Sequence, residues 1–457
     1  MLTFLRQEIQ LFVLILFWVL ASAFVPVLVY GLLPLSILIF RHREHFPEIL
    51  FGFIMVLVLS DVHKDIHALN SFKNAKNVYI VFISLLFLND SGRFMPLAKV
   101  FTLFLPFSIY SIFPLVFSPS LVISVQKTVS YSLLILVIPN YVLYCFRTQG
   151  WPFVRNLMLF LMSVLIIGLY FRFSPLGFVN GRFRGIFGNP NGLGLYCYLS
   201  AVLFAVVNSI NPKLFRYWEK WIIYGALLYF LVFSGSRASL LALGIMFVFQ
   251  RFFSGSVFVG FMALLLFIGV FEYAYSNLEA IVSFFGAEEY LRVNTLESGS
   301  GRYFAWEFAW VQLQSYIVFG GGFGTDEYVM RSFYEYLERM GHQGGVHNSY
   351  ISLWFDVGIV GLVIYLRSLF LIFIKASRFA PMSMAVLFSV LFSVTYESWL
   401  VGSLNPFTIL FVISMTMLSE EEIVLADPEF QGSDNMLTLD VESAERHALP
   451  GHNPSTL

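Results

Sequence analysis

The sequence predicts an all-α membrane protein that crosses the bilayer many times. Hydrophobic residues make up 58% of the 457-residue chain and charged residues only 12%, and the mean hydropathy is +0.78. A soluble domain of this length does not need so apolar a composition for its core. Long apolar stretches recur along the chain, and one long polar segment separates the last of them from the rest. These observations indicate a polytopic helical protein with one large loop outside the membrane.

A membrane helix needs roughly 20 apolar residues, and fewer when it is buried among neighbours. About fourteen segments meet this condition, and because several are short we expect about 12–14 transmembrane helices. The candidates are residues 9–23, 26–40, 47–60, 77–89, 97–117, 127–146, 153–173, 192–210, 220–235, 238–253, 256–275, 348–372, 382–397 and 404–418.

The chain divides into four regions. Residues 1–275 form N-terminal transmembrane helices, 276–347 a large polar loop, 348–418 C-terminal transmembrane helices, and 419–457 an acidic tail. From Glu420 onward there are nine acidic residues and one Arg, with Pro, Gly, Ser and Asp throughout, so we expect this tail to be disordered. Cys145 and Cys197 both lie in apolar stretches, which excludes a disulfide framework.

The basic residues predict which side of the membrane each loop occupies. Lys and Arg in short loops favour the cytoplasm, and long loops do not count in this rule. With the spans above, 14 basic residues fall on one side and 8 on the other. Both chain ends and the acidic tail are therefore expected in the cytoplasm, and the loop 276–347 outside it. Arg182, Arg184 and Arg237 nevertheless lie on the outer side, which suggests an anionic ligand there, although each could instead reach toward lipid phosphates.

The segment from Gly181 to Gly192 reads Gly-Arg-Phe-Arg-Gly-Ile-Phe-Gly-Asn-Pro-Asn-Gly. Its glycines allow the backbone to approach a ligand closely, and Asn191 could cap the helix that follows. Arg184 beside such a helix start is suited to phosphate. The alternative is an ordinary turn between two helices.

The segment Ser234-Gly235-Ser236-Arg237-Ala238-Ser239 joins two apolar runs on the same predicted side. Its hydroxyls and the paired donors of Arg237 could hold phosphate oxygens. Serines that only cap a tight helical hairpin are the competing interpretation.

Within the large loop, Arg302 precedes aromatic residues at helical spacing, Phe304, Trp306, Phe308 and Trp310. This pattern favours a helix at the bilayer interface whose aromatic side chains pack rather than stack on sugars. A Gly-Gly-Gly-Phe-Gly turn at 320–324 follows, which is either a backbone anion nest or a flexible turn.

The loop ends in His347-Asn348, where the next membrane helix begins. A histidine in a wet site can take a proton from a sugar hydroxyl near neutral pH, whereas a lone histidine is more often structural. His347 shares its predicted side with the arginines above, and Glu397 ends another span on that side. This shared location favours a catalytic role.

The sequence indicates neither a cofactor nor a resident metal. It contains no Walker or dinucleotide-binding fingerprint, and His342 and His347 lie in a glycine-rich loop rather than on one helix face. Nothing in it points to a nucleic-acid partner. A donor substrate would therefore have to arrive already activated, and a lipid diphosphate is the obvious form.

With these motifs in this order, the chain resembles the O-antigen ligase and polymerase family of bacterial inner-membrane glycosyltransferases. The matching features are the Arg184 to Asn191 segment, the Ser-Gly-Ser-Arg segment ending at Arg237, Gly301-Arg302 with its aromatic helix, the Gly-Gly-Gly-Phe-Gly turn, and His347-Asn348-x9-Gly358-x2-Gly361. The resemblance covers roughly residues 120–400. Family ligases often have Thr or Val after the last Gly, where this chain has Leu362, so the resemblance does not separate ligase from polymerase.

The resemblance implies a GT-C-like helical fold that acts without a metal at the periplasmic face. The implied donor is an undecaprenyl-diphosphate-linked oligosaccharide, and the acceptor is a glycan or the lipid A core. His347 would be the general base of an inverting transfer, and Arg184 and Arg237, with Arg302 as a third candidate, would hold the diphosphate. The residues expected to orient the histidine or a sugar are Asn189, Asn191, Asn348 and Glu397.

Two readings from other classes remain. A transporter or flippase for a lipid-linked sugar or small anion would show internal repeats and charges near mid-membrane, whereas most charges here gather at span ends. A scaffold that binds other polysaccharide-assembly proteins through its acidic tail is the third possibility.

Overall fold

The computed structural model describes residues 2–63, 66–252, 256–276, 301–342 and 344–432. Almost all of the described chain is helical, and a two-residue hairpin of β1 (Phe178–Val179) and β2 (Arg182–Phe183) is its single sheet. The helices in chain order are α1 (Leu2–Gln7), α2 (Ile9–Phe24), α3 (Leu28–His42), α4 (Phe46–Ser60), α5 (Phe72–Asn89), α6 (Lys99–Tyr110), α7 (Leu121–Gln149), α8 (Trp151–Tyr170), α9 (Pro190–Ile210), α10 (Tyr217–Ser234), α11 (Arg237–Phe252), α12 (Val257–Ser276), α16 (Gly301–Leu313), α17 (Thr325–Ser332), α18 (Tyr334–Arg339), α19 (Ser349–Ala376), α20 (Ser383–Tyr396), α21 (Pro406–Ser419) and α22 (Glu421–Val424).

Each of the fourteen apolar segments found in the sequence corresponds to a helix whose ends differ from the segment by a few residues, except that 97–117 covers both α6 and a 3-10 helix at Phe113–Phe117. Five helical segments of the described chain are long and apolar enough to cross a membrane: Lys99–Phe117, Leu121–Gln149, Trp151–Phe173, Pro190–Ile210 and Ser349–Ala376. Six shorter apolar helices accompany them. The fold is therefore an all-α polytopic membrane protein, as predicted.

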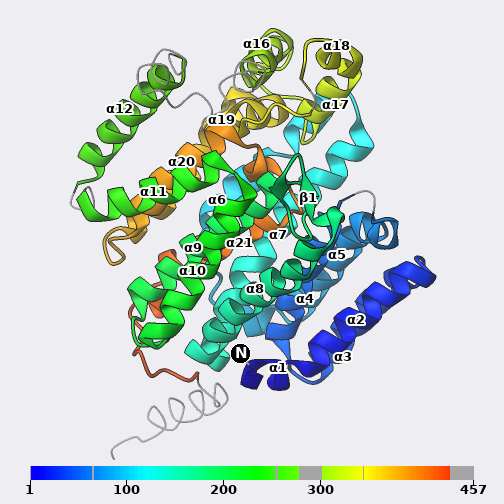
Figure 1. The fold of residues 1–457 in the computed structure, drawn as a ribbon, viewed down its shortest axis with the longest axis vertical. Coiled ribbons are helices and arrows are strands. Elements are labelled where there is room, and N and C mark those ends of the chain that lie inside the picture. The colour runs from blue at the N-terminus through cyan, green and yellow to red at the C-terminus, as the bar shows by residue number, and fades with distance from the viewer. Residues whose placement is uncertain (1, 64–65, 253–255, 277–300, 343, 433–457) are drawn as a thin grey trace, which may run out of the picture.

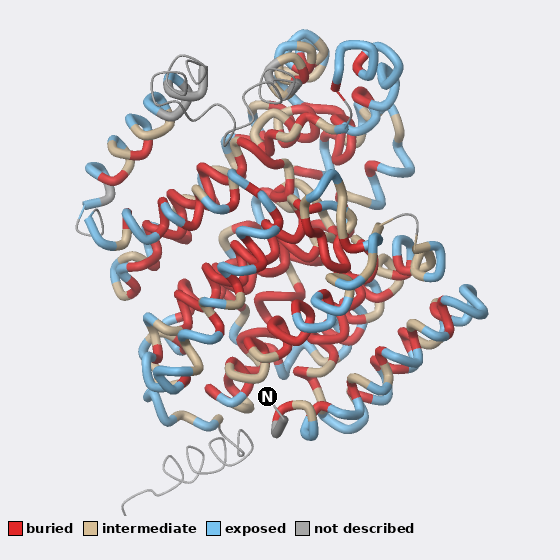
Figure 2. The backbone as a smooth tube through the Cα atoms, viewed as in Figure 1, coloured by how far each residue is buried: buried red, intermediate tan, exposed pale blue. Residues whose placement is uncertain are grey.

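Three helices form the centre of the bundle. Every residue of α21 and nearly every residue of α4 is buried, and α9 packs against α21, α10 and α11. Outer helices such as α2 bury only one side (Figure 2). Val13, Leu16 and Phe17 of α2 are more than half exposed. Exposing so much apolar surface to water would be unfavourable, so this side of the helix is suited to face lipid.

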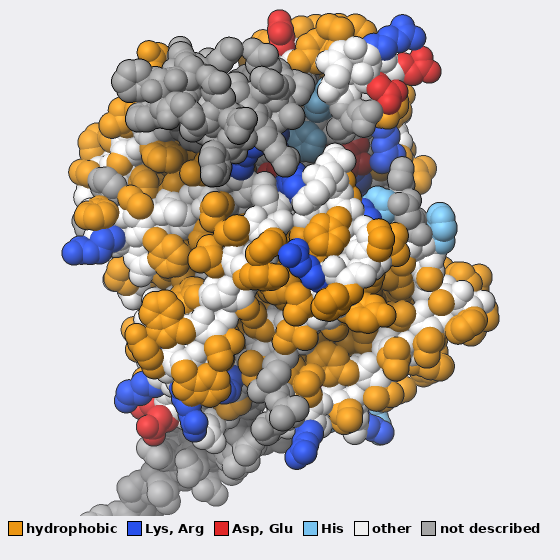
Figure 3. Space-filling model, viewed as in Figure 1, with side chains coloured by type: hydrophobic (Ala, Val, Ile, Leu, Met, Phe, Trp, Pro, Cys, Tyr) orange, Lys and Arg blue, Asp and Glu red, His pale blue; other side chains and the backbone are white. Residues whose placement is uncertain are grey.

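Charged and apolar side chains are separated along the long axis of the molecule. Hydrophobic side chains cover most of the middle of the visible face, and most acidic and basic side chains lie toward its two ends (Figure 3). The N-terminus lies at one end, and α16, α17 and α18 lie together at the other (Figure 1). We call the latter the loop end. The separation is the one expected for a membrane protein with a polar cap.

The helix α19 is interrupted at Gly358, which has φ +66° and ψ 179°. A Cβ there would lie 2.2 Å from the carbonyl oxygen of Val318, so no other residue fits without a backbone shift. Across the break, Ile359 donates its backbone N–H to Ile317 (2.8 Å), and Gly322 donates to Asp356 (2.8 Å). The segment 317–322 therefore fills the break in the membrane helix.

The expectation that the chain is disordered from residue 419 onward is wrong for residues 419–432. Glu422 accepts two hydrogen bonds of 2.7 Å from the buried Arg147, and the ring of Phe430 packs on Phe146 at 5.6 Å. The acidic side chains therefore have basic partners far away in sequence. The rest of the expected tail lies outside the described residues, as does most of the loop segment before residue 301.

Candidate active site

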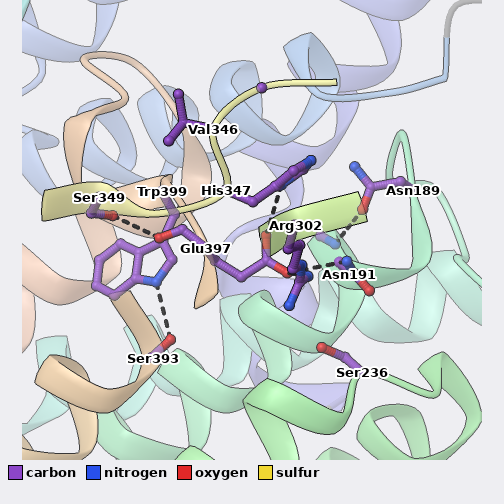
Figure 4. Close-up of polar contacts among 12 residues, drawn as sticks. Asn189, Asn191, Ser236, Arg302, Val346, His347, Ser349, Ser393, Glu397 and Trp399 are labelled. Atoms are coloured by element: carbon purple, nitrogen blue, oxygen red, sulfur yellow. Dashed lines mark hydrogen bonds and ion pairs between the residues drawn. The ribbon is translucent and has the colours of Figure 1, made fainter. Parts of the chain in front are cut away.

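Glu397 follows α20 at the loop end and is 7% exposed. Its Oε1 accepts hydrogen bonds from the guanidinium of Arg302 (2.9 Å) and from Nδ2 of Asn191 (3.1 Å). Its backbone carbonyl accepts a third from the Ser349 hydroxyl (2.7 Å). Figure 4 shows Arg302, Asn191 and His347 converging on this carboxylate from separate parts of the chain. Glu397 therefore joins residues predicted separately from the sequence.

His347 is held beside Glu397 by its neighbours on both sides. Trp306 donates its indole N–H to the carbonyl of Val346 (2.9 Å), and Asn348 caps α19 by accepting from the N–H groups of Tyr350 and Ile351. Nδ1 of His347 lies 3.7 Å from Oε2 of Glu397. The backbone of His347 has φ +51°, a conformation that is uncommon outside glycine and often marks functional sites.

Arg182 connects the β-hairpin to Glu397. Its Nε donates to the carbonyl of Ser234 (2.8 Å), and its terminal nitrogen donates to Oδ1 of Asn191 (2.6 Å). Asn189, not Asn191, caps α9, because its Oδ1 accepts the N–H of Gly192 (2.8 Å). The expected cap is thus corrected by two residues, and Asn191 is left free to bridge Arg182 and Glu397.

Arg237 begins α11 and is exposed, and it forms no hydrogen bond or ion pair with any residue that the structure describes. It lies close enough to Arg182 to act on it electrostatically. The pKa of Arg182 is lowered by burial and then by Arg237 and Arg302, while Glu397 raises it. Three guanidinium groups thus share a region with one carboxylate, and the surplus of positive charge suits an anion.

Arg184 is not part of this cluster. It is 3% exposed, and it donates hydrogen bonds to the carbonyls of Leu176 (2.8 Å) and Gly188 (3.3 Å). These contacts hold the loop that precedes α9 in its conformation. Arg182, its neighbour on the hairpin, is the arginine that contacts Asn191.

The ring of His342 packs next to that of His347, with the two ring centres 6.0 Å apart. Its Nε2 is 3.1 Å from the carbonyl of Gly345. Burial lowers the pKa of His342, and the nearby His347 and Arg302 lower it further. Burial therefore favours the uncharged form of this imidazole, which packs against the ring of His347. In the part of the chain that the structure describes, no three His, Cys, Asp or Glu side chains are grouped so as to hold a metal ion.

The sequence interpretation missed the carboxylates beside the site. Asp356 lies seven residues inside α19 and is 1% exposed, and Asp326, in α17, is 8% exposed. An ionisable residue inside an apolar span is a functional hypothesis by default, so Asp356 could have been found by that signal. Asp326 carried no such signal, because it lies in a polar loop where acidic residues are common.

The family comparison supports the resemblance seen in the motifs. The O-antigen ligase family model matches residues 222–366, which run from α10 into α19 and include Arg237, Arg302 and His347. This match covers less than half of the chain and supports the family resemblance seen in the motifs, while the hairpin with Arg182 lies before it. No curated protein matches the chain. At the level of the family, the match indicates a membrane enzyme of O-antigen ligation or polymerisation.

Proposed function

Because residues 222–366 of this chain form an O-antigen ligase domain, we propose that it is an inner-membrane glycosyltransferase of bacterial cell-surface polysaccharide assembly. It transfers an undecaprenyl-diphosphate-linked glycan to an acceptor sugar at the periplasmic face. The loop end of the molecule is the periplasmic end in this proposal. The transfer is metal-independent and inverts the configuration at the anomeric carbon.

The observation that carries the proposal is the set of groups around Glu397. A positioned imidazole stands beside a carboxylate that is hydrogen-bonded to Arg302 and, through Asn191, linked to Arg182. Arg237 adds an exposed cation with no partner among the described residues. A general base next to a surplus of guanidinium groups is what a transfer from a diphosphate leaving group requires.

In the proposed reaction, Arg182, Arg237 and Arg302 hold the diphosphate of the donor. His347 takes the proton of the acceptor hydroxyl as its oxygen forms a bond to the anomeric carbon. The bond from that carbon to the phosphate oxygen breaks, and its electron pair leaves with the lipid diphosphate. The arginines stabilise the negative charge that develops there, and Glu397 keeps the imidazole and Arg302 in place.

The proposal is tested by a transfer assay with purified protein in proteoliposomes that contain the lipid-linked glycan and its acceptor. His347→Ala is expected to lower turnover by about 10²- to 10⁴-fold, the usual loss for a general base. His67→Ala removes an exposed histidine from a short 3-10 helix that contributes no residue to the site and serves as the matched control. Normal turnover by His347→Ala would remove the central role of this residue.

The sidedness of the site is tested by cysteine labelling in cells. Cys145 and Cys197 are buried, so single cysteines introduced at exposed positions can be read against a low background. Cysteines at positions 237 and 347 should both react with a reagent that cannot cross the inner membrane. Labelling of the two positions from opposite sides would contradict a single periplasmic site.

A deletion strain separates the activities within the family. Loss of long-chain polysaccharide with accumulation of lipid-linked repeats indicates a polymerase, whereas intact polymer with uncapped core lipid indicates a ligase. Uptake of a lipid-linked sugar into proteoliposomes without product formation would instead support the transporter alternative.

A further inference from the structure

A cavity lies beside the loop that carries His347. Its volume is about 510 Å³, within the range of sites for small ligands. The lining comes from α7, α17, α18, α19 and the segment after α20. Its polar side chains include Lys127, Asp326, Glu327, Tyr334, Asp356 and Ser398.

The lining of the cavity includes residues close in sequence to both members of the candidate catalytic pair. Ser398 directly follows Glu397, and Gly344 and Gly345 precede His347 by three and two residues. A Cβ built on Gly344 would lie 2.9 Å from Nε2 of His347. Nδ1 of the same ring is the atom near Glu397. The imidazole therefore has Nδ1 toward Glu397 and Nε2 toward the chain that lines the cavity.

One wall of the cavity contains a buried carboxyl oxygen that receives no hydrogen bond from the described residues. Oδ1 of Asp356 accepts the N–H groups of Gly324 and Thr325, both at 3.0 Å, which fixes the start of α17. Oδ2 is also buried, but no described residue donates a hydrogen bond to it. An acceptor in this state is unfavourable unless a ligand supplies the donor.

The charges of the cavity differ from those of the arginine cluster. Lys127 pairs with Glu327 at 2.5 Å, and Arg331 lies 3.7 Å from the same carboxylate. Both basic residues of the lining are thus paired with Glu327, and Asp326 and Asp356 add further carboxyl groups. Burial, with a contribution from Glu327, raises the pKa of Asp326. A phosphate would therefore find both basic side chains of the lining already paired with a carboxylate, whereas sugar hydroxyls would find hydrogen-bonding partners in the three carboxyl groups.

We propose that this cavity is the acceptor subsite and takes an unphosphorylated sugar ring. Its hydroxyls donate to the carboxyl groups of Asp326, Glu327 and Asp356, and one further hydroxyl is presented to Nε2 of His347. The diphosphate of the donor occupies the arginine cluster on the other side of Glu397. This inference rests on the proposed function and adds to it the location and the charge preference of the acceptor.

The experiment compares kinetics for donor and acceptor in the proteoliposome assay. The donor is the lipid-linked glycan extracted from cells that lack this protein, and the acceptors are octyl glycosides of hexoses and N-acetylhexosamines, each with and without a 6-phosphate. Glu327→Gln and Tyr334→Phe change side chains that are partly exposed, so folding should survive. Glu335→Gln, in α18 but outside the cavity lining, is the matched control.

Both cavity variants should raise the acceptor KM about 5- to 20-fold, the loss expected for one hydrogen bond, and should leave the donor KM within about twofold. The control should match the wild type in both constants. The wild type should use the unphosphorylated glycosides better than their 6-phosphates. An unchanged acceptor KM in both variants, or a preference for phosphorylated acceptors, would overturn the acceptor subsite while leaving the proposed function intact. A wild type that transfers to no acceptor would count against the proposed function itself.

Discussion

Replacing Gly344 by Ala should displace the imidazole of His347 without touching its chemistry. The new Cβ would lie 2.9 Å from Nε2, whereas ordinary contacts begin at 3.4 Å, so the ring must withdraw by about 0.5 Å. A misplacement of about 1 Å can lower a rate by about 10²-fold, which suggests a loss of about tenfold for half that distance. Gly344 also has φ +135°, so the substitution strains the backbone by about 1–3 kcal/mol.

Two neighbouring glycines separate these effects. Gly341 has φ +78° with nothing within 4 Å of its Cβ position, so Gly341→Ala adds strain without a clash. Gly345 has neither a positive φ nor a neighbour within 4 Å, so Gly345→Ala should be nearly silent.

The assay is the initial rate of glycan transfer at saturating donor, with thermal unfolding of each variant in the same detergent. Gly341→Ala and Gly344→Ala should both unfold at a lower temperature than the wild type, but only Gly344→Ala should lose about tenfold in turnover. Turnover by Gly344→Ala within twofold of the wild type would show that Nε2 of His347 does not need this position. An equal loss in Gly345→Ala would refute the clash as the cause.

Three further predictions concern stability, each measured by thermal unfolding. Glu422→Ala should destabilise the protein by about 1–3 kcal/mol, because two donors of the buried Arg147 lose their acceptor while its hydrogen bonds to the carbonyls of Met95 and Pro96 remain. Arg147 lowers the pKa of Glu422, so the difference from the wild type should be full above about pH 4.3 and disappear as the pH falls through the lowered value. Burial raises the pKa of Asp61 to about 7. Between about pH 4 and 7 this carboxyl group is therefore protonated in the folded state but not in the unfolded state, so the stability of the wild type should fall as the pH rises through that range. Asp61→Asn should lack this fall and gain on the wild type toward pH 8, and a pH-independent difference would contradict the burial of the charge. A double-mutant cycle of Arg302→Ala and Glu397→Ala should give a coupling free energy of about 1 kcal/mol, because Arg302 is partly exposed. A coupling of zero would contradict an ion pair between these two side chains.

The helices could be predicted from the sequence because each apolar segment carries its own signal. Their ends were less certain. The helix α5 begins at Phe72, five residues before the apolar segment expected from 77 onward, and Lys76 in this added turn donates to the carbonyl of Leu404 at 2.9 Å. A partner 328 residues away leaves no trace in the local pattern.

Part of the candidate site could be predicted because its residues lie next to apolar segments. His347, Arg237 and Glu397 lie at span ends, where the pattern of apolar segments locates them. The choice between Arg182 and Arg184 depends on the turn at Asn180 and Gly181, which pairs Val179 with Arg182 and turns that side chain toward Asn191. Both arginines have the same neighbours in sequence, so only the folded hairpin distinguishes them.

The break in α19 at Gly358 limits how this enzyme could be recombined with its relatives. Residues 317–322 supply the hydrogen bonds that the interrupted helix lacks, so the outer loop and the membrane helix complete each other's backbone. A chimera that exchanges residues 301–346 alone would join a foreign loop to a helix whose backbone hydrogen bonds at the break depend on the original loop. Domain swaps intended to change acceptor preference should therefore move the loop together with the chain through Gly361.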